Sequence, residues 1–551
     1  MSRWVVEASA QASAEASPVA ARFAALARSQ GAVTALRNGQ NGAASADVDF
    51  AQFWRRTQRV TGHLQATWGV QRGDRVAWLG LNHELQLVTL IACARLGAIF
   101  MPLNYRLAVA ELQQVLRDGQ PALLVHDEPH AAMAAALSPE AMASALCPKT
   151  PPAPWRTVRQ ERLIDSPSPR DLPLPQALGD APVLLVYTSG TTGQPKGALH
   201  SQAGLWANAQ ASDDAHGFVA EDHVLSTLPL FHVGGLCIQT LPALLSGVSV
   251  TLHERFDPGA WLSAVAQDHP TLSLLVPATL RAVLDHPAWA RTDLRSLRGV
   301  MAGSSTIPLA YLQAFHDRGI PVGQIYGTTE TGPVSITLPL AQAQARIGST
   351  GWPQPQAQVQ LRNAAGAVVT PGQTGEVLIR APNVMLGYWQ GPLGAGPIAA
   401  SSDNGGRGLQ DGWFATGDLG QAAADGCITI VGRSKDMIIS GGENIYPAEI
   451  ENLLATLAGV AECAVVGLDD ARWGEVPVAV VVRSANPAGQ ALSEQAVLAH
   501  VQGQIARFKM PRRVVFRAEL PKSALGKVQK STLKSTVQSA LQTQARGGDR
   551  A

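Results

Sequence analysis

The stretch Val183-Leu184-Leu185-Val186-Tyr187-Thr188-Ser189-Gly190-Thr191-Thr192-Gly193-Gln194-Pro195-Lys196-Gly197 carries the strongest signal in the chain. An apolar run typical of a buried strand leads directly into a loop of glycines, hydroxyl side chains and one lysine. Glycines let backbone N–H groups approach a polyanion closely, hydroxyls donate further hydrogen bonds, and lysine adds a positive charge. The loop is therefore predicted to bind phosphates, and an ordinary polar surface loop is the alternative interpretation.

This loop differs from the phosphate loop of the P-loop nucleoside triphosphatases. That pattern requires a Gly-Lys-Ser/Thr step at a fixed distance from its first glycine, at the start of a helix. Here Lys196 is followed by Gly197, and no helix start is evident behind it. The sequence therefore predicts a different class of phosphate site.

Length and charge narrow the range of functions. The 551 residues predict more than one domain, and an apolar content of 46% is sufficient for several cores. Lys and Arg number 43 against 42 Asp and Glu, which leaves a formal net charge of +1. Such balance offers no electrostatic attraction for nucleic acid or for an anionic membrane, so neither is an expected partner.

The cysteines and the apolar segments predict the cellular location. Cys93, Cys147, Cys237, Cys427 and Cys463 have neither metal-ligand nor redox-motif spacing, as expected for reduced thiols in the cytoplasm. The N-terminal apolar run is too short for a signal peptide. The longest apolar segment, residues 87–103, contains Arg95 and is too short to span a bilayer, so integral membrane association is not expected.

The N-terminal part of the chain alternates helical and strand patterns. Residues 18–130 read as β/α units around a largely parallel sheet, and a helix is expected near 130–146. A Pro-rich connector at 148–154 precedes a second β/α stretch that runs to about residue 340. Residues 348–432 look richer in strands, with a Gly/Ser-rich insert at 391–407.

After Gly432 the pattern becomes that of a compact α+β module. A helix is expected from Pro447, because apolar residues follow at helical spacing. Strands are expected at 460–468, 476–483 and 513–516, with a helix near 493–507 and a frayed polar tail over the last fifteen residues. The fold class is α/β: a large N-terminal domain of β/α layers with a β-rich subdomain, followed by a small α+β C-terminal domain.

Several motifs identify a family. The loop Tyr187–Gly197 resembles the phosphate-binding signature of the adenylate-forming superfamily, which includes acyl-CoA synthetases, peptide-synthetase adenylation domains and beetle luciferases. The resemblance extends from about residue 20 to residue 530, and its other motifs follow in the family's order: Ala302–Ser305, Tyr326–Glu330, Asp411–Asp418, Gly432–Ile439, Ser440–Pro447 and Pro521–Lys527. Ala302 departs from the family, which often has a glycine there.

The resemblance implies an ATP site. Tyr326 is implied to lie near the adenine, Thr329 near the α-phosphate, and Asp418 and Arg433 at the ribose. The expected nucleotide-binding residues are Thr188, Ser189, Gly190, Thr191, Thr192, Gly193, Lys196, Gly303, Ser304, Ser305, Tyr326, Gly327, Thr328, Thr329, Asp418, Arg433, Lys435 and Lys527. For Asp418 a turn cap is the alternative interpretation, and for Arg433 a solvated charge.

The resemblance also implies a Mg²⁺ site. Glu330 and Thr192 are the expected ligands, and both are counted among the catalytic residues. A single carboxylate suits a cation that takes few protein ligands and bridges phosphate oxygens. A solvated acid in a turn is the alternative interpretation of Glu330.

The C-terminal motifs are implied to serve catalysis and domain movement. Lys527 matches the family's adenylation lysine, and a cation between two reacting anions offsets their repulsion. Lys435 matches the residue about which the small domain swings, which divides the chain into residues 1–434 and 435–551, with a C-terminal core at about 449–527. Gly441 and Gly442 match a segment beside the pantetheine tunnel of coenzyme A, although a tight turn needs glycines equally.

The acid-binding segments point to an apolar substrate. Leu228–Leu236 resembles the acyl pocket of fatty and aromatic acyl-CoA synthetases. Its His232 is counted among the catalytic residues and is expected at the pocket mouth, and a packed imidazole is the alternative interpretation. Amino-acid-activating relatives place an aspartate in this region. Further walls are expected at 276–279 and 332–335, which are small or apolar. An apolar monocarboxylic acid, fatty or aromatic, is therefore favoured.

The expected enzyme is an acid–CoA ligase that uses ATP, Mg²⁺ and coenzyme A. It would form an acyl-adenylate with release of pyrophosphate, and then an acyl-CoA with release of AMP. The alternatives are an acyl-AMP ligase that does not use coenzyme A, a luciferase-like oxygenase, and a nucleotide-binding relative without catalysis. The sequence leaves the oligomeric state open between monomer and homodimer.

Overall fold

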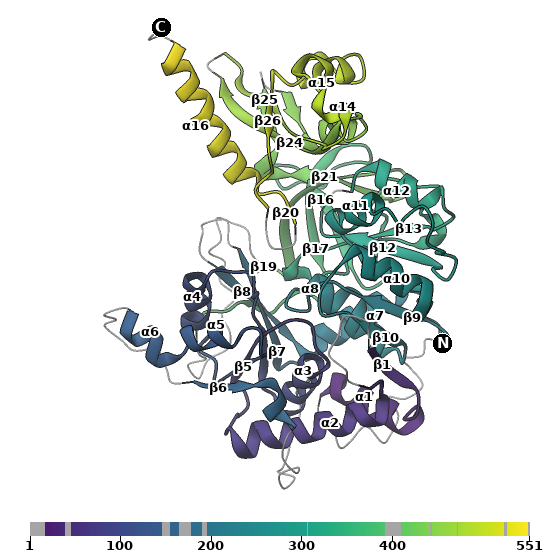
Figure 1. Ribbon diagram of the computed structural model, residues 1–551, viewed down its shortest axis with the longest axis vertical. Helices are drawn as coiled ribbons and strands as arrows, with labels where there is room; N and C mark the ends of the chain where they lie inside the picture. Colours follow the sequence, from purple (N-terminus) through teal and green to yellow (C-terminus); the bar gives the residue numbers. More distant parts are fainter. Residues whose placement is uncertain are drawn as a thin grey trace.

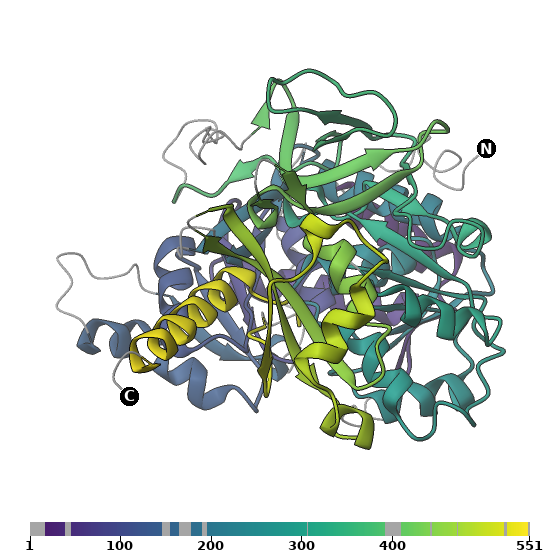
Figure 2. The same cartoon turned by 90° about the horizontal axis from the view of Figure 1, so that it is seen from above.

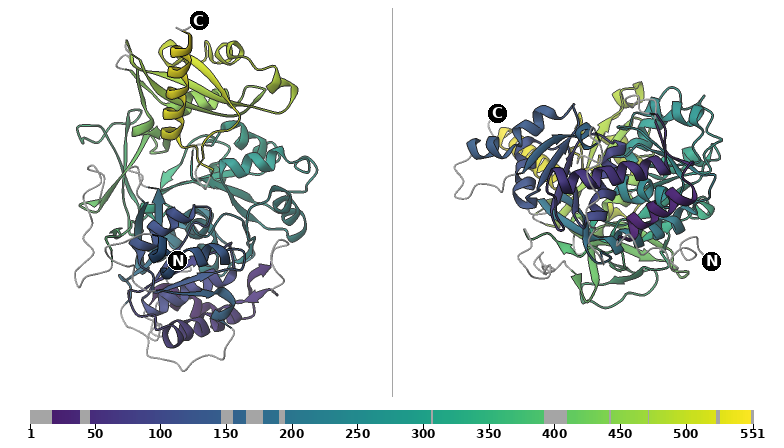
Figure 3. Two further views of the ribbon diagram at one scale, coloured as in Figure 1. Left: turned by 60° about the vertical axis from the view of Figure 1, so that its left-hand side comes forward. Right: turned by 90° about the horizontal axis from the view of Figure 1, so that it is seen from below.

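A computed structural model describes residues 17–38, 46–145, 155–164, 178–189, 195–305, 307–391, 409–440, 443–470, 472–522 and 526–548 of the chain. The N-terminal elements lie at one end of the molecule and the C-terminal elements at the other, with the strand-rich middle of the chain between them (Figure 1). Figure 3 shows the same succession from the side.

One sheet of the N-terminal part has the strand order β18-β8-β7-β4-β3-β5-β6. Its strands from β7 to β6 are parallel neighbours, whereas β8 and β18 are antiparallel additions. The strands are β3 (Arg75–Leu79), β4 (Ile99–Pro102), β5 (Leu123–His126), β6 (Arg156–Arg159), β7 (Pro182–Ser189), β8 (Pro195–Ser201) and β18 (Gly387–Tyr388). The apolar run quoted above is thus β7, and the phosphate-loop stretch connects it to β8.

Helices cover this sheet, and the most buried of them is α3 (Glu84–Leu96). His83 caps its start by accepting a hydrogen bond from the Leu85 N–H, and Gly97 ends it in the left-handed conformation. The apolar segment of the sequence is therefore this helix with β4, and Arg95 within it stacks on the Trp54 ring at 4.9 Å. The remaining helices of this part are α2 (Phe50–Gly62), α4 (Val109–Gly119), α5 (Ala131–Ala136) and α6 (Pro139–Ala145).

A helix long and apolar enough to cross a bilayer does not occur among the described residues.

A second sheet has the order β15-β14-β13-β12-β11-β9-β10-β1-β2. Its strands are β1 (Thr34–Asn38), β2 (Val48–Asp49), β9 (His223–Ser226), β10 (Ser249–Leu252), β11 (Leu272–Leu275), β12 (Gly299–Gly303), β13 (Val322–Tyr326), β14 (Ile336–Leu338) and β15 (Trp352–Pro353). Its helices are α1 (Pro18–Ser29), α7 (Gln202–His216), α8 (Val233–Gly235), α9 (Leu241–Leu245), α10 (Pro258–Asp268), α11 (Pro277–Asp285) and α12 (Leu309–His316). A shared apolar core that includes Phe53, Trp78, Phe100 and Val250 joins this sheet to the first.

The remaining strands form an antiparallel sheet and the C-terminal sheet. The antiparallel sheet contains β16 (Gln358–Arg362), β17 (Thr374–Arg380), β19 (Leu409–Gln410), β20 (Trp413–Ala422) and β21 (Ile428–Arg433). The C-terminal sheet contains β22 (Ile438–Ser440), β23 (Glu443–Ile445), β24 (Val460–Asp470), β25 (Gly474–Arg483) and β26 (Arg513–Arg517), with helices α13 (Pro447–Leu454), α14 (Pro487–Gln490), α15 (Glu494–Val501) and α16 (Lys530–Gly548). Seen from above, this unit covers the centre of the molecule and the antiparallel sheet lies to one side (Figure 2).

The predicted α/β class, with a large N-terminal part and a smaller α+β C-terminal part, is confirmed. Three local predictions were wrong. The expected helix at 130–146 is split into α5 and α6 at Ser138, before Pro139. The helix expected to reach residue 507 ends at Val501. The last fifteen residues were expected to fray, but those that the structure describes, 537–548, belong to α16, whose Leu533 and Val537 are buried one turn apart against β24.

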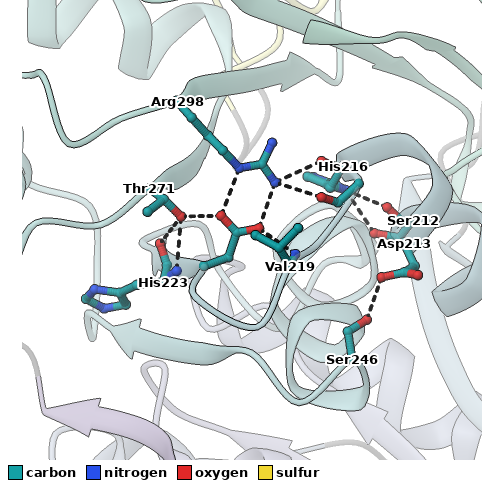
Figure 4. A network of polar contacts seen from close by, with 10 residues as sticks. Ser212, Asp213, His216, Val219, His223, Ser246, Thr271 and Arg298 are labelled. Carbon is teal, nitrogen blue, oxygen red and sulfur yellow. Dashed lines mark hydrogen bonds and ion pairs between the residues drawn. The ribbon is translucent and has the colours of Figure 1, made fainter. Parts of the chain in front are cut away.

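An ion pair between the buried Asp222, just before β9, and Arg298, just before β12, lies next to the end of α7 (Figure 4). Both carboxylate oxygens of Asp222 accept hydrogen bonds from the Arg298 guanidinium at 2.8 Å, and Thr271 Oγ1 donates to Oδ1 at 2.6 Å. Arg298 also donates to the carbonyl of His216 at the end of α7, at 2.9 Å. Burial opposes the ionisation of Asp222, but the hydrogen bonds from Arg298, Thr271 and the Val219 N–H lower its pKa overall.

Replacing Arg298 by leucine should therefore destabilise the fold. Arg298→Leu leaves the buried Asp222 carboxylate without its counter-ion, and we expect a loss of about 2–3 kcal/mol, discounted because the arginine is 35% exposed. The midpoint of thermal unfolding measures the effect. Because the pKa of Asp222 is lowered in the folded state, its stabilisation is lost as the pH falls through that value, so the two proteins should converge in acid.

The matched control is Arg295→Leu, whose side chain is 90% exposed and pairs with the exposed Asp293. We expect no measurable change in the midpoint of thermal unfolding for this variant, because exposed ion pairs contribute little to stability. Equal destabilisation by the two variants would contradict the role assigned to the buried pair.

Candidate active site

A cavity of about 840 Å³ lies where the ends of β12 and β13 meet the antiparallel sheet and the C-terminal unit. Residues predicted from distant motifs line it together: Gly303, Ser304, Ser305, Tyr326, Gly327, Asp418, Arg433 and Lys527. Gly303 and Gly327 are needed for close backbone approach. A Cβ would lie 2.4 Å from the Ile325 carbonyl oxygen at Gly303, and 2.3 Å from that of Pro333 at Gly327. Ser304 has the left-handed φ of +76°.

Three of these residues form one hydrogen-bonded group. The pairing of β20 with β21 places Asp418 opposite Arg433, whose Nε lies 2.8 Å from Asp418 Oδ1. The Tyr326 hydroxyl donates to Asp418 Oδ2 at 2.8 Å. Each carboxylate oxygen keeps a second lone pair for a ligand hydroxyl. The geometry is therefore compatible with the predicted contact of Asp418 with both ribose hydroxyls.

The contacts among Asp418, Tyr326 and Arg433 also determine the protonation states of the tyrosine and the arginine. Burial and then the Asp418 charge raise the pKa of Tyr326 well above its usual value, so the phenol stays neutral. Burial works against the charge of Arg433, but Asp418 and neighbouring groups raise its pKa overall. A neutral donor and a permanent cation thus hold one buried carboxylate.

Thr328 and Thr329 follow β13 in the turn that carries Glu330. Thr329 is buried, and the Thr328 N–H donates to Thr331 Oγ1 at 2.9 Å. Thr328 Oγ1 is buried and lacks a hydrogen-bond partner within the described part of the chain. A buried hydroxyl in that state costs stability unless a ligand satisfies it, as expected for a phosphate site.

Tyr388 interacts with both Glu330 and Lys196. The Tyr388 hydroxyl donates to Glu330 Oε1 at 2.7 Å, and the Lys196 ammonium lies 5.7 Å from the centroid of the Tyr388 ring. The Thr188 hydroxyl is directed within its own hairpin, toward the Lys196 carbonyl oxygen at 3.4 Å. Glu330 and Lys196 were expected from the motifs, whereas Tyr388 was missed.

Lys527 reaches the N-terminal part from the loop before α16. The loop rests on α11, where a Cβ at Gly526 would lie 3.0 Å from that of Ala278. Burial and the nearby Arg433 charge lower the pKa of Lys527 to about 8. Burial, and then the positive charge of Lys527, lower the pKa of His232 to about 4. The structure thus brings His232 and Lys527 into electrostatic contact, although 295 residues separate them in the sequence.

The neutral His232 has a defined tautomer. Its Nδ1 accepts a hydrogen bond from the Gly234 N–H at 2.9 Å, so the proton of the neutral ring resides on Nε2. His232 therefore caps the start of α8 and offers a hydrogen-bond donor without adding a charge.

Behind the cavity lies an apolar cluster to which all three predicted acid-pocket segments contribute. Leu228, Val276 and Val334 come from those segments. The other members are Ala211, Ala215, Ile238, Leu274, Met301 and Ile325, which the sequence analysis did not single out. They come from α7, from the turn after α8 and from the interiors of strands, where any core residue has the same pattern.

Some predicted residues cannot be placed. Gly190, Thr191, Thr192, Gly193, Gly441 and Gly442 lie outside the described residues, as does the side chain of Ser189. Lys435 is exposed in the short turn Ser434–Asp436 between β21 and β22. Their roles stay predictions.

Two family models match the chain, one over its N-terminal part and one over its C-terminal part. Residues 23–389 match the AMP-binding enzyme family, and residues 449–527 match the AMP-binding enzyme C-terminal domain. The chain belongs to the AMP-binding enzyme family. It is an ATP-dependent acid–thiol ligase with the activity of an acyl- or aryl-CoA ligase.

Three relatives of this AMP-binding enzyme carry the comparison. Indoleacetate–CoA ligase of Aromatoleum aromaticum is 45% identical over 500 residues, which cover 89% of this chain and 93% of the relative. The structure of the anthranilate CoA ligase AuaEII with anthranoyl-AMP matches with a TM-score of 0.84 and 26% identity, over 96% of this chain and 98% of that chain. The structure of the o-succinylbenzoate–CoA synthetase MenE of Bacillus subtilis, in complex with ATP and magnesium, matches with a TM-score of 0.79 and 28% identity. The match covers 93% of this chain and 99% of that chain.

The lowered pKa of Lys527 can be tested directly. In the ligand-free enzyme, competitive labelling of amines across a pH series should give Lys527 an apparent pKa of about 8, against about 10.4 for an unperturbed lysine. Arg433→Met should raise that value, because it removes a neighbouring positive charge and leaves Asp418 to favour the ammonium. A labelling curve centred near pH 10 would contradict the described position of Lys527.

Proposed function

We propose that this ligase activates an apolar aromatic monocarboxylic acid, of the aryl-acetic or aryl-carboxylic type, through an acyl-adenylate. One observation carries the proposal: β12 and β13 run from the apolar cluster directly into the nucleotide cavity. Met301 and Ile325 belong to the cluster, and Gly303 and Tyr326 line the cavity. An apolar acid in the cluster would thus present its carboxylate to a bound nucleotide.

The apolar composition of the cluster favours an acid without a second charged group. All its members are apolar, so a second carboxylate or an ammonium group would lose its hydration there without a counter-ion. Flat aromatic rings suit such a pocket, and two of the similar proteins act on indoleacetate and anthranilate. Fatty acids, which the sequence left open, are the less favoured alternative.

In the first step, a carboxylate oxygen attacks the α-phosphorus of ATP. The bond from that phosphorus to the bridging oxygen breaks, and its electron pair leaves with pyrophosphate. Lys527 would offset the repulsion between the two anions and the charge that develops on the phosphoryl oxygens. Its pKa of about 8 in the free enzyme keeps most of the side chain protonated at neutral pH, and a bound polyanion favours the ammonium further.

Glu330 and Thr192 are the proposed magnesium ligands. The donor set fits, because Mg²⁺ usually takes one or two carboxylates and completes its shell with phosphate oxygens and water. A group of three or more His, Cys, Asp or Glu side chains that could hold a metal ion does not occur among the described residues. Glu330 and Thr192 would hold the magnesium ion, which would supply positive charge against the phosphates, and Lys196 would add a further positive charge to the same ligand.

In the second step, the sulfur of coenzyme A attacks the acyl carbon, and the bond to the AMP oxygen breaks. We propose that the C-terminal unit, residues 435–551, rotates about Lys435 between the steps, withdraws Lys527 and brings Gly441 and Gly442 beside the coenzyme A channel. The exposed position of Lys435 between β21 and β22 supports a hinge there. His232 can move between the two states because it is neutral and half-buried at the mouth of the acid pocket.

Lys527→Ala should separate the two half-reactions. We expect adenylate formation, followed by pyrophosphate exchange, to fall about 10²–10³-fold, as for the loss of one electrostatic stabiliser. Transfer to coenzyme A from supplied acyl-adenylate should stay within about threefold of the wild type, because Lys527 is withdrawn in that step. Lys534→Ala on α16, whose lysine pairs with Glu475, serves as the matched control. Equal loss in both half-reactions would contradict the assigned role.

The acid class is tested by mass spectrometry of the products. The pure enzyme is incubated with Mg-ATP, coenzyme A and a pool of aryl-acetates, benzoates, cinnamates, fatty acids, dicarboxylates and amino acids. We expect aryl-acyl-CoA and AMP as the main products. Products from dicarboxylates or amino acids alone would refute the apolar pocket, and acyl-adenylates without thioester would refute the use of coenzyme A.

A further inference from the structure

Tyr388 is held at the exit of the phosphate loop by backbone pairing. Its two-residue strand β18 pairs with β8, so that Tyr388 lies opposite Ala198, two residues beyond Lys196. The flanking residues secure the strand, since the Leu386 N–H donates to the Leu199 carbonyl and the Trp389 N–H to the Gly197 carbonyl, both at 2.7 Å. Tyr388 therefore has a fixed position next to the loop.

The same short segment also holds the turn that carries Glu330. The Met385 N–H donates to the Glu330 carbonyl oxygen at 2.8 Å, and the Tyr388 hydroxyl donates to Glu330 Oε1 at 2.7 Å. With Oε1 engaged, Oε2 is the carboxylate oxygen that Tyr388 leaves for another ligand. Backbone and side chain together fix the orientation of this carboxylate.

The ring of Tyr388 has a second function at Lys196. The ammonium lies 5.7 Å from the ring centroid, within the range of a cation–π interaction. A lysine and a glutamate that face the same polyphosphate would otherwise attract each other, and an ion pair between them would weaken the interaction of each with the ligand. The tyrosine contacts both groups and gives each a separate partner.

We propose that Tyr388 is a positioning residue for metal–nucleotide binding: it orients Glu330 toward the cation and keeps Lys196 directed to the phosphates. The inference rests on the magnesium role proposed for Glu330. It assigns Tyr388 no contact with the reacting atoms. A substitution of Tyr388 should therefore change the dependence of nucleotide binding on Mg²⁺ and leave Mg²⁺-independent binding of the nucleotide unchanged.

Tyr388→Phe tests the hydroxyl while it keeps the ring over Lys196. Binding of ATP to the full-length enzyme is titrated calorimetrically over a Mg²⁺ series, without carboxylic acid, so that no reaction occurs. We expect the Mg²⁺ concentration for half-maximal binding to rise about tenfold, because the lost hydrogen bond is to a charged group. Binding of AMP in the presence of a chelator should stay unchanged, since it depends on contacts such as those of Tyr326 and Asp418.

A double-mutant cycle separates positioning from a structural effect. Glu330→Gln should raise the Mg²⁺ requirement, and adding Tyr388→Phe to it should raise the requirement no further. Ser246→Ala is the matched control. It removes another hydroxyl–carboxylate hydrogen bond, from Ser246 to Asp213 at 2.9 Å, outside the site, and should leave the Mg²⁺ dependence unchanged. Thermal unfolding of each variant confirms that it is folded.

The outcomes distinguish the two levels of the argument. If Glu330→Gln leaves the Mg²⁺ dependence unchanged, the magnesium role of Glu330 is wrong and the inference on Tyr388 falls with it. If Glu330→Gln shifts the dependence but Tyr388→Phe does not, or weakens AMP binding equally, only the role of Tyr388 is overturned. A shift confined to Mg²⁺-dependent binding, and absent in the Glu330→Gln background, supports it.

Discussion

The buried carboxylate of Asp418 is the interaction on which the site depends. It accepts hydrogen bonds from Tyr326 at the end of one sheet and from Arg433 at the end of another. A carboxylate without such partners would be costly at 5% exposure, so the two sheets are held in register by the need to satisfy it. The charge of Asp418 also acts on Lys527, which lies on the C-terminal unit. One acid thus relates the positions of three parts of the chain.

The positive groups around this acid are balanced against one another. Burial and then the Arg433 charge lower the pKa of Lys527, and burial and then the Lys527 charge lower the pKa of His232 and keep it neutral. Concentrated positive charge of this kind is unfavourable in the empty site and favourable once a polyanion enters. The protein therefore holds these positive groups in place before the reaction begins. Such preorganisation is the condition for electrostatic stabilisation of a transition state.

The sequence predicted the parts of the site that are contiguous motifs, and it missed the contacts between them. Glu330 was expected from the threonines before it, but its partner Tyr388 lies 58 residues later on a two-residue strand, too short for a periodic pattern. The acid-pocket segments were found by resemblance, whereas Met301 and Ile325 look like any buried strand residues. The tail was misjudged because its polar composition hid the spacing of Leu533 and Val537, whose burial depends on β24.

The start of α11 connects the apolar cluster with the loop that carries Lys527. Val276, the residue that precedes the helix, belongs to the apolar cluster. Two residues on, Ala278 lines the nucleotide cavity and supports Gly526, the residue before Lys527. Under the proposed function, an acid bound against the cluster would lie next to the same helical turn that contacts Gly526. Because packed side chains transmit strain, the fit of the acid and the placement of Lys527 would then be mechanically linked, without a separate signalling element.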